Sequence, residues 1–272
     1  MYSFKENLSG IWQLYIAENN ACRSIASEIS CENTLKNQNF LNICGSVPGN
    51  FELDMLENGL IPDPFFGTNS LELQKLENRH LWYVKRFTYN GSNPENAYLL
   101  FEGIDTIADI YLNGEKIGSC DNMFLSHEFK ATGILKGENE LLVHIKPVCI
   151  EARKRKFNAE VNTQQPYNAA SLTVRKAAHS FGWDIFLRAV SGGIWKDVFV
   201  VEKKPDYIRD IFIYTQNASS SRAVLGCFVD LELDGDFATD YSLKIEGICG
   251  NSRFLLHKKR LHCWSTQNKQ TN

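Results

Sequence analysis

The sequence has little of what marks several large classes of protein. Only 18 of its 272 residues are glycine and seven are proline, and no heptad or other short repeat runs along it. Collagen-like, coiled-coil and low-complexity proteins are therefore excluded. No run of 18 apolar residues occurs, so we expect no membrane-spanning helix. The net charge is only −3, which provides no global field for binding nucleic acid or an anionic membrane.

The eight cysteines form no CxxC pair and have no zinc-ligand spacing. We therefore predict free, mostly buried thiols in a reducing compartment, with disulfides as the alternative that an even count allows. The N-terminal residues lack a basic stretch followed by an apolar one, so the sequence predicts no signal peptide and a cytoplasmic location. A processed secreted chain with an added methionine would look the same. No residue pattern indicates a metal ion or a cofactor.

What the sequence does contain is a dense β-pattern. Hydrophobic residues make up 43% of the chain and aromatic residues 12%, enough for a large core. Asn113-Gly114 predicts a tight hairpin, because a type I′ turn needs positive φ at both central residues. Trp82 and Trp195 lie in strand-like runs and are predicted core residues. Branched and aromatic runs bounded by turn residues predict many short strands, which indicates a β-sandwich. These runs are 81–89, 98–101, 107–112, 140–145, 197–201, 210–215, 225–233 and 241–248.

Three stretches interrupt the strand pattern. Residues 51–60 and 71–77, on either side of Pro62-Asp63-Pro64, look like short helical or irregular segments. Residues 150–161 are charged and compatible with a helix, and they contain the basic run 153–156. A solvated helical insertion explains that run better than contact with nucleic acid, because the whole chain is acidic.

A domain boundary is predicted where a strand-like run ends, charges cluster and Pro205 stops the pattern. It divides the chain into residues 1–204 and 205–272. The second part holds three strand-like runs, after which residues 254–272 have no clear periodicity. An immunoglobulin-like sandwich takes about 100 residues and seven strands, so the second domain looks incomplete.

No Ser-His-Asp, P-loop, Rossmann or HExxH pattern is present. Instead, an ordered series of short motifs runs along the chain. Its members are Val47-Pro48-Gly49, Asp63-Pro64-Phe65, Phe101-Glu102-Gly103-Ile104-Asp105, Leu112-Asn113-Gly114, Gly137-Glu138-Asn139, Arg175-Lys176, Phe181-Gly182-Trp183-Asp184 and Ser191-Gly192-Gly193-Ile194-Trp195.

This series, which covers about residues 8–201, resembles the N-terminal sugar-binding domain of glycoside hydrolase family 2, in its β-mannosidase branch. The resemblance implies an all-β chain: a jelly-roll, galactose-binding-like β-sandwich followed by part of an immunoglobulin-like β-sandwich. In that family a (β/α)₈ barrel follows and carries both catalytic glutamates. Such a barrel alone takes about 250 residues, so no residue of this chain is assigned a catalytic role.

The resemblance also implies a contact with substrate. In the β-mannosidase branch, the loop that matches residues 181–184 reaches over the barrel mouth, and its Asp accepts hydrogen bonds from a hydroxyl of the terminal sugar. The predicted substrate-binding residues are therefore Trp183, Asp184 and Arg175, with Arg175 pairing with Asp184 or holding the loop in register. The alternatives are a core aromatic residue for Trp183 and a turn or capping residue for Asp184.

This loop departs from the usual pattern of the branch. A second Trp and a Gly-Pro often follow the Asp, whereas Ile185-Phe186-Leu187-Arg188 follow it here. Among the six histidines, only His179 lies beside this loop in the sequence.

The implied reaction of the parent enzyme is the release of terminal β-linked mannose with retention, without metal or cofactor. The expected partners are a β-mannoside or related carbohydrate and the missing (β/α)₈ barrel, and neither nucleic acid nor membrane. Another family 2 enzyme, such as a β-galactosidase, β-glucuronidase or exo-β-glucosaminidase, is one alternative. A free-standing carbohydrate-binding module, with an exposed aromatic platform on a sandwich face, is another. A scaffold domain that packs against a barrel, with Trp183 buried, is the third.

Overall fold

The computed structural model describes residues 2–156, 166–233, 241–250 and 252–258. By its internal contacts the chain divides into two compact units, Tyr2–Lys203 and the part from Lys204 onwards. Both units are built mainly from antiparallel strands. The predicted all-β fold class, a jelly-roll sandwich followed by immunoglobulin-like sheets, is confirmed.

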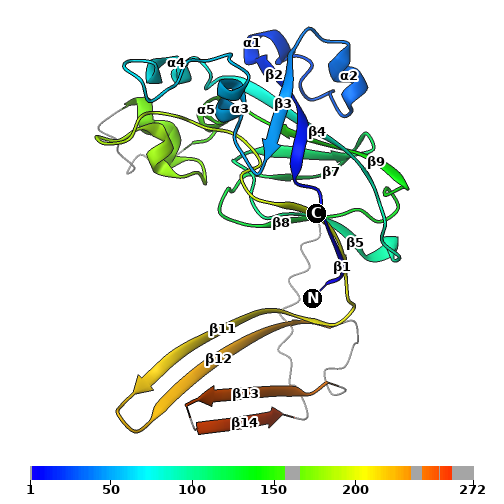
Figure 1. Cartoon of the computed structure of the whole chain (residues 1–272), viewed down its shortest axis with the longest axis vertical. Helices are drawn as coiled ribbons and strands as arrows, with labels where there is room; N and C mark the ends of the chain where they lie inside the picture. Colours follow the sequence, from blue (N-terminus) through cyan, green and yellow to red (C-terminus); the bar gives the residue numbers. More distant parts are fainter. Residues whose placement is uncertain (1, 157–165, 234–240, 251, 259–272) are drawn as a thin grey trace. The chain divides into compact units, whose positions relative to one another are not determined.

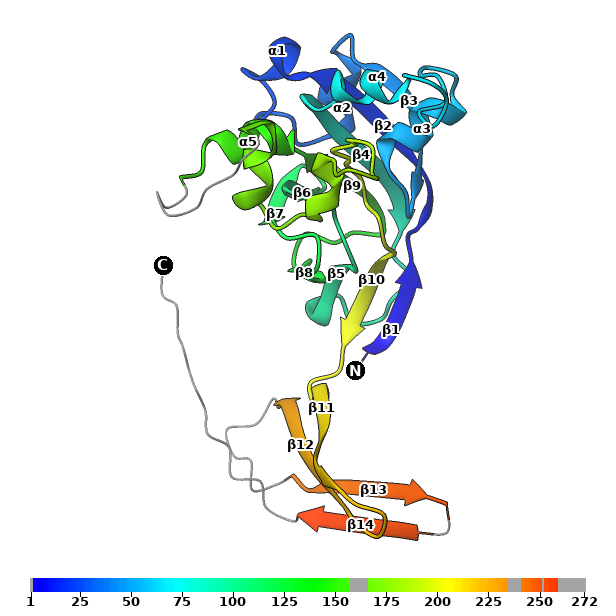
Figure 2. The same ribbon diagram turned by 90° about the vertical axis from the view of Figure 1, so that its left-hand side faces the viewer.

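The first unit is a sandwich of two antiparallel sheets (Figures 1 and 2). The large sheet has the order β3-β2-β4-β9-β6-β7 and the small sheet the order β1-β10-β5-β8. The strands of the large sheet are β2 (Gly10–Glu18), β3 (Leu41–Val47), β4 (Arg79–Thr88), β6 (Ala108–Leu112), β7 (Glu115–Cys120) and β9 (Glu138–Ile145). The strands of the small sheet are β1 (Tyr2–Asn7), β5 (Ala97–Phe101), β8 (His127–Lys130) and β10 (Val198–Lys203).

The main core lies between the two sheets, because alternate residues of each strand point to the same face. Leu14, Tyr83 and Val143 are side by side in the large sheet, and all three are fully buried. They belong to the same core cluster as Leu99 and Val200, which pair in the small sheet. Burial of each aliphatic side chain stabilises the fold by roughly 1.5–3 kcal/mol.

The outer face of the large sheet is covered as well. Between β2 and β3 the chain forms the short helices α1 (Asn19–Cys22) and α2 (Glu32–Lys36), which lie near β2 and β4 (Figure 1). Side chains of this segment meet Tyr15 and Trp82 in a second core. With both faces covered, residues 80–84 of β4 are all buried, and Trp82 is a core residue as predicted.

The remaining helices of the first unit are short. They are α3 (Phe51–Glu57), α4 (Ser70–Gln74), α5 (Val148–Arg153), η1 (Pro94–Asn96), η2 (Pro166–Leu172) and η3 (Ala178–Phe181). Asn50 caps α3, because its side chain accepts a hydrogen bond of 3.0 Å from the Leu53 N–H. The helix predicted at 150–161 begins earlier and ends at Arg153, and residues 157–161 lie outside the described part of the chain.

Four strands of the first unit are not predicted from the sequence. Strands β1, β2 and β3 precede the first predicted run, and β8 has only four residues. In β1 the residues alternate between half-buried and exposed, and the sequence has no apolar run there that would predict a strand. In the second unit, residues 252–258 form β14, a strand that was not predicted because residues 254 onwards show no clear periodicity.

The second unit contains two separate two-stranded antiparallel sheets, β11 with β12 and β13 with β14. Their bounds are Tyr207–Ala218, Ala223–Glu232, Leu243–Cys249 and Ser252–Lys258. Large apolar side chains are exposed on both faces of the β11–β12 hairpin. Ile211 and Ile213 are exposed on one face, and Phe212 and its cross-strand partner Phe228 are exposed on the other.

We predict that limited proteolysis cleaves this second unit first and leaves a core that ends near Lys204. A two-stranded sheet is marginally stable in water, and apolar side chains that stay exposed contribute little to its stability. Mass spectrometry of the digest identifies the surviving fragment. A single protease-resistant species of full length would contradict this prediction.

In the part of the chain that the structure describes, no helix is both long and apolar enough to cross a membrane.

Candidate functional site

The loop between η3 and β10 begins with a tight turn, whose central residues are Asp184 and Ile185. Trp183 and Phe186 exchange backbone hydrogen bonds, with N···O distances of 3.2 and 3.1 Å, and these close the turn. Gly182 has a φ of +92°, which L-residues rarely adopt, so glycine is required at the entry to the turn. We call residues 183–186 the tip.

The side chains of the tip point into solvent. The Trp183 side chain is 69% exposed, which is incompatible with the alternative of a core aromatic residue. Asp184 is exposed, and its carboxylate has no hydrogen-bond or ion-pair partner among the described residues. His179 stacks at a tilt on Phe186, with ring centroids 5.6 Å apart. The tip therefore presents an indole ring beside a carboxylate that is free to accept hydrogen bonds.

The base of the tip is clamped by an ion pair. Arg188 binds Glu77 through two contacts, Nε···Oε1 at 2.6 Å and Nη2···Oε2 at 2.8 Å, and it also donates to the Phe181 carbonyl at 3.0 Å. Both side chains of the pair are mostly buried. Bidentate Arg–carboxylate pairs fix orientation as well as distance, so the base of the tip is held against the turn that follows α4. The sequence motifs include Arg188 only among the residues that follow Asp184, and they do not include Glu77.

A second set of contacts holds both ends of residues 176–191, the segment that contains the tip. The fully buried Lys176 pairs with Asp105 and donates a 2.8 Å hydrogen bond to the Ser191 carbonyl. The Ser191 hydroxyl donates to Glu52 of α3 at 2.7 Å. Burial raises the pKa of the Glu52 carboxyl to about 7, although the hydrogen bond from Ser191 and the charge of Lys176 oppose that rise. These contacts tie residues 176–191 to the sandwich.

Arg175, the third predicted site residue, makes its contacts with residues outside the tip. No hydrogen bond or ion pair among the described residues joins it to Asp184, so the predicted pairing is not formed. Its backbone bridges Asn122, and its carbonyl accepts a 3.0 Å hydrogen bond from the Met123 N–H. Its side chain lines a cleft of about 670 Å³ that contains neither Trp183 nor Asp184.

Trp195, predicted to be a core residue, is instead 36% exposed. Its indole Nε1–H donates to the Met123 carbonyl at 3.2 Å, and the Lys196 ammonium lies 4.4 Å from its ring centroid. The prediction is wrong because the ring packs over the loop at Met123 and does not enter the space between the sheets.

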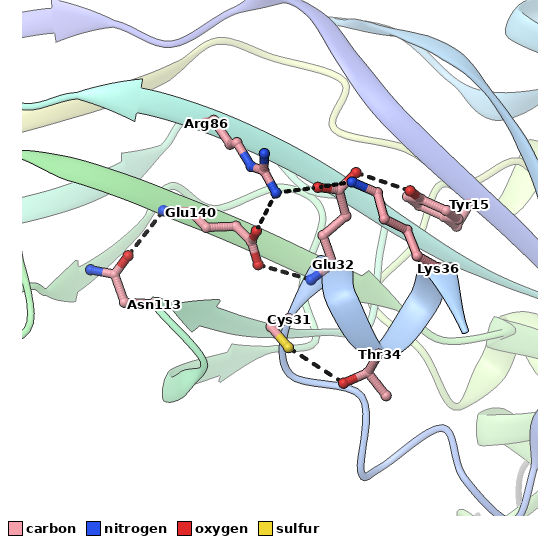
Figure 3. A network of polar contacts seen from close by, with 8 residues as sticks. All are labelled: Tyr15, Cys31, Glu32, Thr34, Lys36, Arg86, Asn113 and Glu140. Atoms are coloured by element: carbon pink, nitrogen blue, oxygen red, sulfur yellow. Dashed lines mark hydrogen bonds and ion pairs between the residues drawn. The ribbon is translucent and has the colours of Figure 1, made fainter. Parts of the chain in front are cut away.

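A network around Glu32 anchors α2 to the large sheet (Figure 3). Glu32 accepts from the Tyr15 hydroxyl at 2.9 Å and from Arg86 at 2.7 Å, and Lys36 lies 3.1 Å from its carboxylate. Glu140 accepts from the Glu32 backbone N–H at 2.8 Å and from Arg86 at 3.3 Å. Each charge is compensated within the network, so we assign it a structural role.

The Glu32 network also shifts pKa values. Burial raises the pKa of Glu32, but hydrogen bonds from Lys36 and Tyr15 and the charges of Lys36 and Arg86 outweigh burial and lower it below its usual value. Burial, followed by the hydrogen bond to Glu32, raises the pKa of Tyr15 to about 12. The carboxylate therefore stays charged and the phenol stays neutral at neutral pH.

A buried histidine pair lies in the second core. His80 Nδ1 and His144 Nε2 are 2.8 Å apart, and His80 Nε2 is 3.1 Å from Asn19 Oδ1. The Trp82 ring stacks on His144 at a centroid distance of 4.6 Å. Burial lowers the pKa of His80 to about 4 and that of His144 to about 3. Both imidazoles are neutral at neutral pH, and in the described residues no cluster of three His, Cys, Asp or Glu side chains could hold a metal ion.

The fold and the tip define the first unit as a β-sandwich with an exposed, clamped loop that offers an aromatic ring and a carboxylate. Residues 29–196 match the family model described as glycosyl hydrolase 2 galactose-binding domain-like. This match covers more than half of the chain, so the chain belongs to that family. The resemblance seen in the sequence motifs is confirmed.

The curated relatives include beta-mannosidases. Beta-mannosidase B of Emericella nidulans is 30% identical over 216 residues, which cover 74% of this chain and 25% of the relative. Beta-mannosidase B of Thermothelomyces thermophilus is 35% identical over 156 residues, 56% of this chain and 18% of the relative. Beta-mannosidase of Mus musculus is 30% identical over 169 residues, 58% of this chain and 19% of the relative. The chain thus spans a quarter or less of these relatives.

Solved structures are similar over nearly the whole chain. The beta-D-mannosidase of Dictyoglomus thermophilum has a TM-score of 0.74 and 29% identity, covering 95% of this chain and 30% of that one. The exo-chitosanase of Amycolatopsis orientalis has a TM-score of 0.59 and 17% identity, covering 94% of this chain and 27% of that one, and shares the fold alone.

Proposed function

We propose that this chain is the non-catalytic front part of a glycoside hydrolase that releases terminal β-linked mannose, and that its tip contacts the substrate. The observation that carries the proposal is the exposed Trp183-Asp184 pair on a clamped loop. The identity and coverage of the beta-mannosidase relatives support mannose as the sugar. The domain limits of 1–204 and 205–272 are part of this proposal.

The chemistry of the tip suits a pyranose. An indole ring stacks on the C–H face of a sugar, and a carboxylate accepts hydrogen bonds from two neighbouring hydroxyl groups. Because the Asp184 carboxylate has no partner in the described part of the chain, no existing bond has to break before it accepts from a sugar. Arg188 and Lys176 pre-position the loop, which reduces the entropy lost on binding.

No carboxylate of this chain is assigned to acid or nucleophile catalysis. Glu102 forms an ion pair with Lys5 at 3.6 Å, and Asp105 is paired with the buried Lys176. Burial raises the pKa of Glu52 into the range of a general acid, but its side chain is buried and accepts a hydrogen bond from Ser191. We propose that the two catalytic carboxylates belong to a barrel that packs beside this unit.

A free-standing carbohydrate-binding module is the second candidate, and the small sheet argues against it. Such a module would offer free aromatic faces on one side of a sheet. On the small sheet the Lys5 ammonium lies 3.6 Å from the Phe199 ring centroid, and the Lys203 ammonium lies 4.4 Å from that of Tyr98. In both rings a cation occupies one face, so a sugar would have to displace it to stack there.

Replacing Asp184 with Ala tests the proposal. In this chain the melting temperature should stay nearly unchanged, because surface substitutions usually alter stability by within about ±0.5 kcal/mol. In the longer enzyme that carries this chain, kcat/KM for an aryl β-mannoside should fall by about 100-fold or more, because a hydroxyl contact that strengthens in the transition state is lost.

Asp230→Ala, which removes an exposed carboxylate of the second unit, is the matched control and should leave kcat/KM unchanged. A drop of many degrees in the melting temperature of the Asp184→Ala chain would make Asp184 a structural residue. An unchanged kcat/KM in the longer enzyme would remove the tip from the substrate site.

A further inference from the structure

The cleft beside Arg175 is a second candidate binding site in the first unit. Its volume of about 670 Å³ lies within the range of roughly 300–1,000 Å³ that small-molecule sites occupy. The lining residues are Asp121, Asn122, Arg155, Ser171, Leu172, Thr173, Val174 and Arg175. We call this the Arg175 cleft.

Most polar groups of the Arg175 cleft are already engaged. Arg155 pairs with Asp121 at 3.0 Å and donates to the Thr173 carbonyl at 3.0 Å. The Thr173 hydroxyl donates to backbone carbonyls, and the Asn122 side-chain oxygen accepts from the Phe124 N–H at 2.9 Å. The one carboxylate of the cleft is therefore neutralised by one of its two guanidinium groups.

The side-chain groups of the cleft that have no partner among the described residues are hydrogen-bond donors, and one of them is positively charged. The exposed Arg175 guanidinium has no hydrogen-bond or ion-pair partner in the described residues, and the Asn122 amide nitrogen is likewise available. A guanidinium prefers planar anionic groups that take two parallel hydrogen bonds, such as a carboxylate, sulfate or phosphate. The cleft thus favours an anionic group at Arg175.

The cleft is larger than a bare anion needs, and two of its lining residues are apolar. Leu172 is 44% exposed and forms an aliphatic wall, with the buried Val174 beside it. A sugar ring places C–H groups against such a wall and hydroxyl groups toward an amide such as that of Asn122. In the basic run 153–156, two of the four charges are compensated, because Lys154 pairs with Glu151 and Arg155 with Asp121.

We propose that the Arg175 cleft binds a saccharide that carries an anionic group, with Arg175 binding that group. The site goes beyond the proposed function, because it takes a different class of sugar and shares no lining residue with the tip. It assigns Arg175 a ligand of its own in place of the predicted pairing with Asp184.

Titration of the whole chain, followed by NMR or calorimetry, tests this proposal with four probes. Methyl β-glucuronide and glucose 6-phosphate carry the anion on a sugar, methyl β-glucoside is the neutral sugar, and inorganic phosphate is the bare anion. The first two should saturate at concentrations up to about 10 mM and bind at least tenfold more tightly than the last two. Arg175→Gln should weaken both by about tenfold or more, and Arg175→Lys should weaken them less.

Arg153→Gln is the matched control, since it removes the same charge from α5 outside the cleft, and it should leave binding unchanged. Asp184→Ala should also leave binding unchanged, and this outcome separates the cleft from the tip. Equal binding of methyl β-glucoside, equal binding of inorganic phosphate, no binding of either anionic sugar, or binding lost in Asp184→Ala but kept in Arg175→Gln would each overturn the proposal.

Discussion

Replacing Lys176 with Met should lower the free energy of unfolding of the first unit by roughly 3–5 kcal/mol. The ammonium is fully buried and is paired with Asp105. Its removal leaves the Asp105 carboxylate uncompensated in a low-dielectric environment. It also removes the positive charge that lowers the pKa of the nearby Glu52. The loss includes the hydrogen bond to the Ser191 carbonyl, so the segment that carries the tip is freed at one end.

Chemical denaturation, followed through the transition of the first unit, measures this change. Lys154→Met is the control, because Lys154 pairs with Glu151 at the surface and such pairs contribute about 0–1 kcal/mol. The double variant Lys176→Met with Asp105→Leu should recover much of the loss, since an apolar pair replaces a broken ion pair. A Lys176→Met variant within about 1 kcal/mol of the unchanged chain would show that the pair adds nothing to stability.

Acid should weaken the first unit through the histidine pair. The pKa values of His80 and His144 fall to about 4 and about 3 on folding, from 6.5, because both rings are buried. Below pH 6.5 the two histidines bind protons in the unfolded chain but stay neutral in the folded chain. The contribution of the pair to the free energy of unfolding is therefore complete above pH 6.5 and is lost as the pH falls toward the pKa values of the folded state. Each histidine adds a slope of up to about 1.4 kcal/mol per pH unit.

Two buried carboxylates act in the opposite direction. Burial raises the pKa of Glu52 to about 7 and that of Asp54 to about 6, so these groups favour the folded state as the pH falls. A single pH profile therefore sums opposing effects, and a comparison of variants isolates the histidines. Between about pH 6 and pH 5, the unchanged chain should lose up to about 1.4 kcal/mol more stability than His144→Asn does. Identical slopes for the two proteins would contradict the account of this pair.

The strands were predictable where the local pattern carried the information. In β4 the aromatic and apolar residues around Trp82 are dense enough to identify a strand without knowledge of its neighbours. The hairpin at Asn113-Gly114 follows from two residues alone, which have φ angles of +53° and +85° and join paired strands β6 and β7. Strand β1 was missed because an edge strand with half-buried alternation has no strong pattern of its own.

The site was predictable only in part, for a physical reason. The motif around Trp183 predicts that the tip is a site. The exposure of Trp183 and Asp184, however, depends on the turn that follows Gly182 and on ion pairs with residues distant in the sequence. Lys176 and Arg175 are adjacent and carry the same charge, yet Asp105 reaches only the first of them across the fold. Nothing local in the sequence distinguishes the buried cation from the exposed one.

The most direct test of the central claim is an activity assay of the purified chain with an aryl β-mannoside. A retaining glycosidase needs two carboxyl groups about 5–5.5 Å apart on either side of the glycosidic bond. Of the acidic groups in the tip and its clamps, Asp184 alone is exposed and without a partner in the described residues, because Glu77 and Asp105 form ion pairs and Glu52 is buried. We predict no turnover above the uncatalysed background. Turnover that co-purifies with the chain and disappears in Glu52→Gln, the variant that removes its buried carboxyl of raised pKa, would show that this unit catalyses hydrolysis itself.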